Sequence, residues 1–256
     1  MMPYWFCMGD VWAPAPERLG LRDNEIHVWR AWLDLTPADF ESVANALTPD
    51  EQARAARFIS PRHGRRFSAA RGVLREILSR YLDRNPSQLQ FCYGPSGKPA
   101  LAPGSGMDEL RFNLSHSHGL ALYAVTRARE VGVDVERIQP QLAEEQIAER
   151  FFSPGEVAEL RALPPSVQAE AFFNCWTRKE AYIKARGEGM AIPLNSFDVS
   201  LAPGAPAALL SVRRDLEECA RWSLRAVASS AGYAAAIAAE GNDWRLQLWE
   251  WRRRAM

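Results

Sequence analysis

One predicted helix, residues 172–186, limits what this chain can fold into more than any other stretch. Glycines at 187 and 189 follow it and end the helical pattern. At about 100° per residue, an apolar stripe runs along one side of the helix and predicts a face packed against a core. This stripe contains Phe172, Trp176 and Ile183.

Three charged residues lie on or beside the same stripe: Lys179, Glu180 and Lys184. The residues on the opposite side are Asn174, Arg178, Ala181 and Ala185. Burying an unpaired charge is costly, so the charged groups need a metal, a phosphate or one another as partners. A structural Glu180–Lys184 pair at i,i+4 spacing is common on helices and is the simplest alternative. The helix alone does not decide between a structural pair and a ligand site.

The composition excludes several classes of protein. The 256 residues carry 31 Lys and Arg against 31 Asp and Glu, so the net charge gives no argument for nucleic-acid or membrane binding. The four cysteines form no Cys-x-x-Cys pair, which disfavours a zinc ribbon or a disulfide framework and fits a reducing cytosol. The N-terminus is a poor signal peptide, and the longest apolar run, near 231–239, is too short to cross a bilayer. We therefore expect a cytoplasmic protein with no membrane or nucleic-acid partner.

Capping residues and hydrophobic periodicity predict a mixed chain of helices and antiparallel strands. Helices are expected over 36–47, 48–58, 61–82 and 141–152, and after Ser153. Strands are expected over 25–33, 197–201, 207–213, 222–228, 233–239 and 244–249. Residues 1–24 are expected to form an irregular arm.

An arginine-rich stretch lies between positions 54 and 80, where Glu76 is the only acid. A solvated basic face is the usual explanation of such a charge run. Eight arginines in a neutral protein also suit a polyphosphate ligand or an acidic protein partner. Nucleic acid fits less well, because no aromatic residues interleave as stacking platforms. The arginines are Arg54, Arg57, Arg62, Arg65, Arg66, Arg71, Arg75 and Arg80.

Three short apolar runs, 110–115, 119–126 and 131–136, are separated by short turns and predict an antiparallel meander. In the third run, valines at 131, 133 and 135 point one way, so Gly132, Asp134 and Glu136 share the other face. Two neighbouring carboxylates repel unless a cation or a proton lies between them. The pair suits a Mg²⁺ site, and the alternative is an acidic edge strand facing water.

Two further motifs are weak when taken separately. The turn around Gly97-Lys98-Pro99 can bring backbone amides and an ammonium group to a phosphate, although most such turns are only turns. Ser115-His116-Ser117-His118 lacks the signature of a hydrolase triad or a zinc site, but a serine and a histidine can contact phosphate.

The order and spacing of these motifs resemble those of the Sfp-type 4′-phosphopantetheinyl transferases. The similarity runs from about Leu47 to Phe197 and includes the Arg-Phe and Ala-Arg-x-x-Leu-Arg pattern at 57–75. The motifs are Gly97-Lys-Pro99, Phe112-Asn-Leu-Ser-His-Ser117, Gly132-Val-Asp-Val-Glu136, Arg150-Phe-Phe-Ser-Pro-Gly-Glu156 and Trp176-Thr-Arg-Lys-Glu-Ala-Tyr-Ile-Lys184. Residues 1–24 and the last ten or so match no pattern of the family.

The resemblance implies an α+β fold of two similar halves that form an intramolecular pseudo-dimer, with the active site in the cleft between them. We place the halves at residues 1–126 and 127–256. The implied activity is Mg²⁺-dependent transfer of 4′-phosphopantetheine from coenzyme A to a serine of an apo acyl or peptidyl carrier protein, with release of 3′,5′-ADP. The implied partner is an acidic carrier protein of fatty acid, polyketide, nonribosomal peptide or lysine synthesis, and the enzyme is expected to be a monomer.

The resemblance also implies roles for individual residues. The implied metal ligands are Asp134, Glu136 and Glu180. The implied coenzyme A contacts are Arg54, Arg71, Lys98, Ser115, His116 and Lys184. The implied catalytic residues are Glu180, Lys184 and Glu156, and the base is Glu180, Glu156 or a metal-bound water. Glu51 departs from the pattern, because some relatives carry a basic residue at this position of the early helix.

Two other functions compete with the transferase. A metal-dependent phosphohydrolase would use water as the acceptor and would need no carrier protein. A non-catalytic module would bind acidic proteins or nucleic acid through the arginines, and loss of a metal-site carboxylate would have favoured it. All three carboxylates are present.

Overall fold

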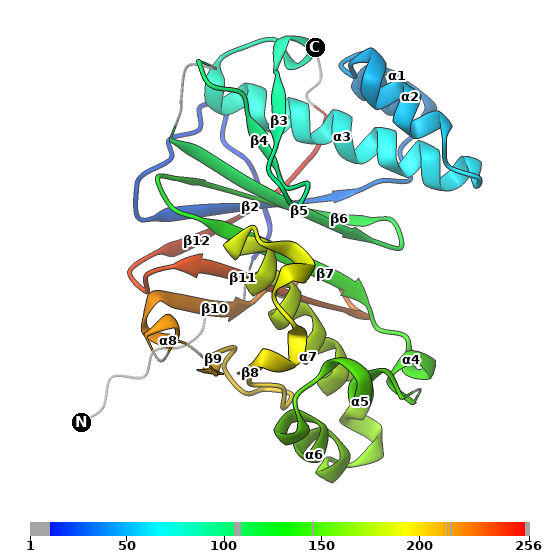
Figure 1. Ribbon diagram of the computed structural model, residues 1–256. Helices are drawn as coiled ribbons and strands as arrows, with labels where there is room; N and C mark the ends of the chain where they lie inside the picture. The colour runs from blue at the N-terminus through cyan, green and yellow to red at the C-terminus, as the bar shows by residue number, and fades with distance from the viewer. Residues whose placement is uncertain (1–10, 105–108, 145, 214, 216, 254–256) are drawn as a thin grey trace.

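The order of secondary-structure elements occurs twice along the chain (Figure 1). A computed structural model describes residues 11–104, 109–144, 146–213, 215 and 217–253. Each copy within them has a strand, short helices, a helix of 22 residues, a two-stranded hairpin and two more strands. The protein is therefore an α+β fold of two similar halves, a duplication that no repeat in the sequence reveals.

The first copy contains β2 (Glu25–Trp32), α1 (Pro37–Ala44), α2 (Pro49–Ala56), α3 (Pro61–Leu82), β3 (Phe91–Tyr93), β4 (Pro99–Leu101), β5 (Leu110–Ser117) and β6 (Leu120–Arg127). The second contains β7 (Val131–Arg137), α4 (Pro140–Glu144), α5 (Ile147–Phe151), α6 (Pro154–Ala162), α7 (Pro165–Arg186), β8 (Phe197–Val199), β9 (Leu209–Val212), α8 (Glu218–Arg221), β10 (Trp222–Ala226) and β11 (Tyr233–Glu240). Strand pairing repeats as well, since β2-β6-β5 in the first sheet corresponds to β7-β11-β10 in the second.

The C-terminal strand does not stay with the second half. β12 (Arg245–Glu250) pairs in parallel with β2, and β1 (Ala13–Pro14) pairs with β12 at the outer edge of the first sheet. The first copy ends with β6 at Arg127 and the second begins with β7 at Val131, while residues 245–250 belong to the sheet of the first copy. The N-terminal arm is described only from residue 11, so the expectation for residues 1–10 lies outside the described part of the chain.

The predicted three-stranded meander is wrong for its third strand. β5 and β6 form an antiparallel pair, but β7 hydrogen-bonds along its length to β11, more than ninety residues later in the sequence. Proximity in sequence favoured β6 as the partner, whereas the duplication places β7 at the start of a new sheet.

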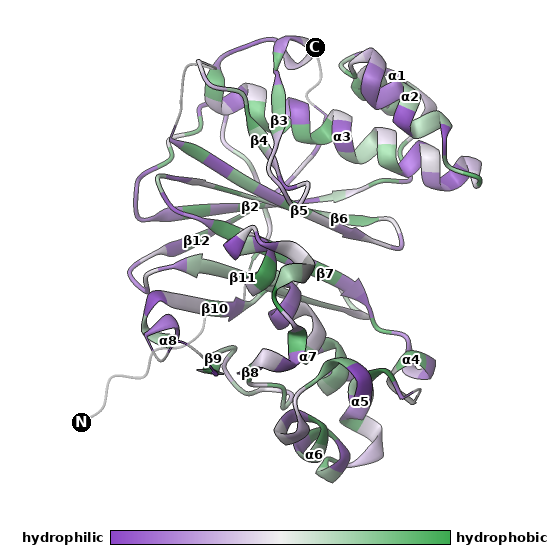
Figure 2. Ribbon diagram, in the orientation of Figure 1, coloured by the Kyte–Doolittle hydropathy of each residue, from purple (hydrophilic) through white to green (hydrophobic). Residues whose placement is uncertain are grey.

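The two sheets face each other across a shared apolar core, and a long helix covers each outer face. Val131, Val133 and Val135 pack in this central core, as the alternation predicted, against β2, β6 and β11. α3 lies over the first sheet and α7 over the second, each with a core of its own. Figure 2 shows hydrophobic residues along β6 and β11 and more polar ones on α1 and α2.

Local signals explain where the helices begin and end. Thr48 and Ser153 each form a capping box with the glutamate three residues later, and proline occupies the first helical turn in both cases. α7 ends at Gly187 in the left-handed conformation, with φ of 71°. The predicted helix over 141–152 is instead two short helices, α4 and α5. Among the described residues, no helix is both long and apolar enough to cross a membrane.

α7 is buried on more than one side, which the sequence did not predict. Phe172 and Ile183 are buried as expected, but Ala181 and Ala185 on the opposite side are fully buried as well. These small residues face β7, where a Cβ on Gly132 would lie 2.1 Å from the Ala181 carbonyl oxygen. Glycine on the strand and alanine on the helix thus allow a close approach, which brings the charged residues of α7 up to the acidic face of β7.

Candidate active site where the two sheets meet

The edge strands β5 and β7 are joined by side chains of β5 rather than by a backbone ladder. Asn113 Oδ1 accepts a hydrogen bond from the Val133 amide at 2.9 Å. Ser115 Oγ donates to Asp134 Oδ1 at 2.7 Å, and Ser117 Oγ donates to Glu136 Oε2 at 2.6 Å. Alternate residues of a strand share a face, so the side chains of Asn113, Ser115 and Ser117 all point from β5 to β7 in the second half. We call this junction between β5 and β7 the seam.

Lys184 completes this cluster from α7. Its Nζ lies 2.6 Å from Asp134 Oδ1 and 3.0 Å from Ser115 Oγ. Asp134 is 2% exposed, so the ammonium group supplies the positive charge that a buried carboxylate requires. The structure therefore brings together Ser115, Asp134 and Lys184. Lys184 pairs with Asp134, so the alternative of a structural Glu180–Lys184 pair is not observed.

The other two carboxyls of the site, Glu136 and Glu180, have raised pKa values because they are buried close to other negative charges. Burial and the nearby Asp134 and Glu180 raise the pKa of Glu136 from 4.5 to about 7, although Ser117 and Lys184 oppose the shift. Burial and Asp134 also raise the pKa of Glu180. Both pKa shifts indicate that the site, with its carboxyls ionised, holds too little positive charge to neutralise them.

The donor set fits a hard divalent cation. Asp134 Oδ2 is buried and has no hydrogen-bond partner, so one carboxylate oxygen is left for a ligand. Glu136 and Glu180 would regain their ordinary acidity beside a cation. Over the described residues, however, no three His, Cys, Asp or Glu side chains are already arranged around one metal position. A metal would thus have to draw the carboxylates together, with Lys184 yielding its place beside Asp134.

A pocket of about 540 Å³ adjoins this cluster. Glu180, Ile183 and Lys184 form its α7 wall, and the β3–β4 hairpin forms another wall through Lys98 and Pro99. Apolar side chains from β5, α5 and the segment after α7 line much of the rest: Leu114, Phe151, Ile192, Pro193 and Leu194. Asn113, Arg150 and Asn195 add polar groups to the lining. The pocket can take a mostly apolar chain whose charged end lies at Glu180 and Lys184.

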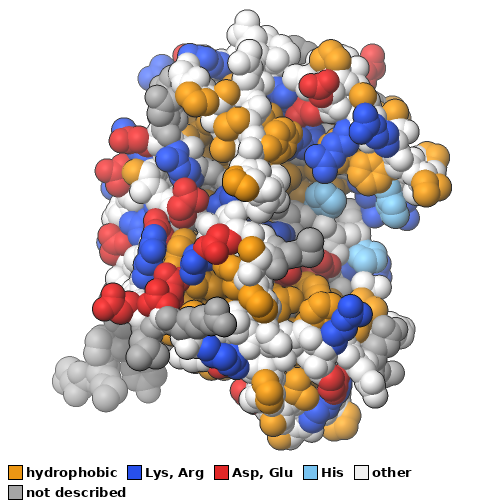
Figure 3. Space-filling view, in the orientation of Figure 1, with side chains coloured by type: hydrophobic (Ala, Val, Ile, Leu, Met, Phe, Trp, Pro, Cys, Tyr) orange, Lys and Arg blue, Asp and Glu red, His pale blue; other side chains and the backbone are white. Residues whose placement is uncertain are grey.

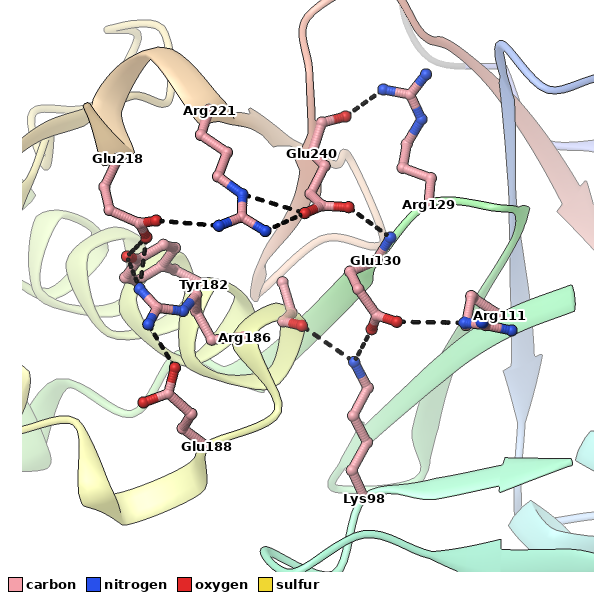
Figure 4. Close-up of polar contacts among 11 residues, drawn as sticks. Lys98, Arg111, Arg129, Glu130, Tyr182, Arg186, Glu188, Glu218, Arg221 and Glu240 are labelled. Carbon is pink, nitrogen blue, oxygen red and sulfur yellow. Dashed lines mark hydrogen bonds and ion pairs between the residues drawn. The ribbon is translucent and has the colours of Figure 1, made fainter. Parts of the chain in front are cut away.

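Lys98 ties the hairpin to the second half (Figure 4). Its Nζ donates to Glu130 at 3.0 Å, to the Val131 carbonyl at 3.2 Å and to the Ala185 carbonyl at 3.1 Å. These bonds use all three donors of the ammonium group. Lys98 therefore holds the start of β7 and the end of α7 in place and contributes to the pocket mainly by anchoring its wall.

His116 follows Ser115 on β5 and is exposed. Partial desolvation, together with Lys184 and Arg66, lowers its pKa, so the ring is neutral near pH 7. A neutral imidazole at this position can donate one hydrogen bond and accept another.

Glu156 is not brought to the seam. One of its oxygens accepts from the Val199 amide at 2.8 Å, and the other accepts from the Ser153 amide and forms an ion pair with Lys179 at 2.8 Å. Glu156 and Lys179 are both buried, and Lys179 also donates to the carbonyls of Leu194 and Phe197. Both residues hold α6, α7 and β8 together, and nothing in this geometry supports Glu156 as a catalytic residue.

Acidic residues from outside the arginine-rich stretch neutralise part of its positive charge in the folded protein. Asp34 pairs with Arg62 and Arg66, and Glu51 pairs with Arg71 and Arg75. Arg54 instead lies over the Phe67 ring at 5.3 Å and lines a second groove, between α2, α3 and β3. Figure 3 shows Lys and Arg side chains gathered over α2 and α3 at the upper right.

Two of the residues that bridge the seam were not predicted from the sequence. Asn113 and Ser117 alternate with Ser115, and this period of two was the available signal. Asp34 and Glu51 were not recognised as partners of the arginines, because they lie outside the arginine-rich stretch.

Comparisons with known proteins agree with the resemblance. A family model described as the 4′-phosphopantetheinyl transferase superfamily matches residues 130–238, and one described as 4′-phosphopantetheinyl transferase, N-terminal, matches residues 30–128. The 4′-phosphopantetheinyl transferase HetI of Nostoc sp. is 41% identical over 240 residues, which are 94% of this chain and 98% of that protein. The transferase Sfp of Bacillus subtilis is 29% identical over 65% of this chain and 72% of its own length. Holo-[acyl-carrier-protein] synthase of Thermotoga maritima aligns with a TM-score of 0.35 and 21% identity over 45% of this chain and 64% of that protein.

Proposed function

Because this chain belongs to the 4′-phosphopantetheinyl transferase family, we propose that it moves 4′-phosphopantetheine from coenzyme A to a serine hydroxyl of an apo carrier protein and releases 3′,5′-ADP. One observation supports this assignment most strongly. An unpartnered oxygen of Asp134, two carboxyls with raised pKa values and Lys184 meet beside a pocket of about 540 Å³.

Mg²⁺ is the proposed cofactor, held by Asp134, Glu136 and Glu180. When bound, it would neutralise charge on the diphosphate of coenzyme A and on the departing phosphate. The carboxylate oxygens are ligands that this ion prefers, and the raised pKa values indicate that the site favours a gain of positive charge.

The proposed reaction is an in-line displacement at the phosphorus that carries pantetheine. The serine oxygen bonds to this phosphorus, and the bond to the bridging oxygen of 3′,5′-ADP breaks. Glu180, which lines the pocket beside Lys184, accepts the serine proton. Lys184 donates to the diphosphate and stabilises the negative charge on the leaving phosphate.

Coenzyme A would lie along the seam and over the hairpin. We assign its diphosphate to Ser115, His116 and Lys184, and its pantetheine arm to the pocket with Ile183 and Leu194. Arg54 would meet the 3′-phosphate in the groove between α2 and β3. Lys98 and Arg71 are engaged in internal ion pairs, so we propose that they act by holding the walls of the binding surface.

The remaining proposals concern organisation and partners. We assign residues 1–126 to the half that binds most of coenzyme A and residues 127–256 to the half with the carboxylates, with the exception of β12. A monomer suffices, since both sides of the seam come from one chain. The proposed partner is an acidic acyl or peptidyl carrier protein, which would complement Arg54 on α2 and Arg57 at the C-cap of this helix.

Formation of 3′,5′-ADP tests this function against the phosphohydrolase alternative. The protein is incubated with coenzyme A and Mg²⁺, with and without an apo carrier protein, and 3′,5′-ADP is quantified by chromatography. A transferase forms the product only when the carrier is present, and Glu180→Gln abolishes it while the protein stays folded. Formation of 3′,5′-ADP at an equal rate without the carrier protein would instead identify a hydrolase.

A further inference from the structure

We propose that the ring of Tyr93 is the surface on which the adenine of coenzyme A stacks, and that Glu51 and Arg71 fix the position of this ring. The inference deepens the proposed function and rests on it, since coenzyme A is the substrate considered. It also explains why an acid replaces a basic residue at position 51.

Glu51 is a structural residue and not a failed phosphate contact. It is 5% exposed, and its carboxylate caps α2 by accepting from the Thr48 amide at 3.1 Å. Arg71 Nε donates to Glu51 Oε1 at 3.0 Å, and Arg75 Nε donates to Oε2 at 2.8 Å. Two guanidinium groups therefore surround one buried carboxylate, which fixes both arginines on α3.

Arg71 extends this network to the hairpin. Its Nη2 donates to the Tyr93 hydroxyl at 2.8 Å, and its guanidinium lies 4.9 Å from the centre of the Phe91 ring. Tyr93 is nevertheless 52% exposed, although large aromatic residues are usually buried more deeply. A ring that is fixed at its hydroxyl end and open to solvent is preorganised to stack against a flat ligand.

The surroundings of Tyr93 suit a nucleotide. The groove that it lines has a volume of about 920 Å³ and also contains Arg54, Arg57 and Phe67. An aromatic face next to cationic side chains is the combination that binds a base together with its phosphate. The basic patch over α2 and α3 in Figure 3 lies in this region.

The position of Tyr93 also allows one ligand to reach the seam. Tyr93 pairs with Pro99 across the hairpin, and Pro99 lines the pocket that contains Glu180 and Lys184. The groove and the pocket therefore share the hairpin as a common wall. A long ligand can place its base at Tyr93 and its diphosphate at the seam.

The test compares two nucleotides that differ in the base. Calorimetry gives the affinity of the full chain for 3′,5′-ADP and for cytidine 3′,5′-bisphosphate, which presents a smaller stacking surface. Tyr93→Ala should weaken 3′,5′-ADP binding by about tenfold or more, the range expected for base stacking on an aromatic ring, and should remove the preference for the purine. Tyr93→Phe should retain the purine preference, because the ring remains. Trp32→Ala, which removes another exposed aromatic ring, serves as the matched control and should bind as the wild type does.

The outcomes separate this inference from the proposed function. An unchanged purine preference in Tyr93→Ala, or an equal loss of affinity for both nucleotides, would overturn the stacking role and leave the transferase proposal intact. If the wild-type protein bound neither nucleotide nor coenzyme A, both proposals would fall. Tyr93→Leu, which keeps apolar volume without an aromatic face, replaces Tyr93→Ala if the alanine variant does not fold, with the same two outcomes.

Discussion

Glu136→Gln should stabilise the metal-free protein at neutral and alkaline pH. Glu136 shares the seam with Asp134 and Glu180, and burial together with these charges raises its pKa from 4.5 to about 7. An acid whose pKa rises on folding makes the folded state bind the proton more tightly than the unfolded chain does. The free energy of unfolding therefore falls as pH rises from about 4.5 to about 7, and above that range the full penalty remains.

The size of the effect follows from the two pKa values. Their difference corresponds to about 3.5 kcal/mol in favour of the neutral form, at about 1.4 kcal/mol per pH unit. Glu136 is only partly buried, so screening reduces the expected gain to about 2 kcal/mol. Glutamine keeps an acceptor for the Ser117 hydroxyl, and the hydrogen bond at 2.6 Å can therefore be retained in the variant.

Urea unfolding between pH 4.5 and pH 8 in the presence of EDTA gives the measurement. The wild type should lose stability over this range relative to Glu136→Gln, and the two should converge near pH 4.5. Added Mg²⁺ should stabilise the wild type more than the variant, because it supplies the missing positive charge. Glu159→Gln, which neutralises an exposed glutamate, should leave the pH dependence unchanged. Parallel curves for wild type and Glu136→Gln would refute the argument that Glu136 carries an electrostatic penalty.

Three further variants test the supports of the site. Gly132→Ala should destabilise the protein by about 3 kcal/mol and impair transfer, because the new Cβ would lie 2.1 Å from the Ala181 oxygen, whereas Gly20→Ala should be neutral in the same urea titration. Lys98→Met should lower the free energy of unfolding by about 2 kcal/mol and speed amide exchange at the end of α7, since three hydrogen bonds are lost; unchanged exchange would contradict the anchoring role. Lys179→Met should cost about 3–5 kcal/mol by leaving Glu156 buried without its partner. If Glu156→Gln abolished turnover in a fully stable protein, the structural role of that pair would be refuted.

Much of the fold follows from local sequence signals. The helix over 61–82 was predicted with its observed ends, because turn-forming residues at 83–86 follow Leu82 and stop the helical pattern. The strand face of Gly132, Asp134 and Glu136 was also predicted correctly, since alternation is a property of the strand itself. Local periodicity therefore predicts which residues share a face.

Long-range pairing was harder to predict. The pairing of β7 with β11 and of β12 with β2 joins segments that are distant in sequence, and no turn fixes their register. The burial of Ala181 and Ala185 depends on Gly132, which lies on another element. Each of these features depends on contacts between elements that are distant in sequence.

In the candidate site, too, local motifs could be predicted from the sequence and long-range contacts could not. Asp134, Glu136, Glu180 and Lys184 were placed through the motifs that resemble the family, and the structure brings Asp134 and Lys184 into contact. The burial of Glu156 with Lys179 depends on α6 and β8, so the motif alone could not reveal it. The motifs thus placed these residues in one candidate site, while tertiary contacts determine which side chains each of them touches.

The mass of an apo carrier protein after incubation tests the central claim most directly. The carrier is mixed with this protein, coenzyme A and Mg²⁺, and intact-mass spectrometry followed by digestion locates any adduct. We predict one phosphopantetheine group on one serine of the carrier, and no adduct with Glu180→Gln. A carrier of unchanged mass, across acyl and peptidyl carriers and with folded wild-type enzyme, would contradict the assignment.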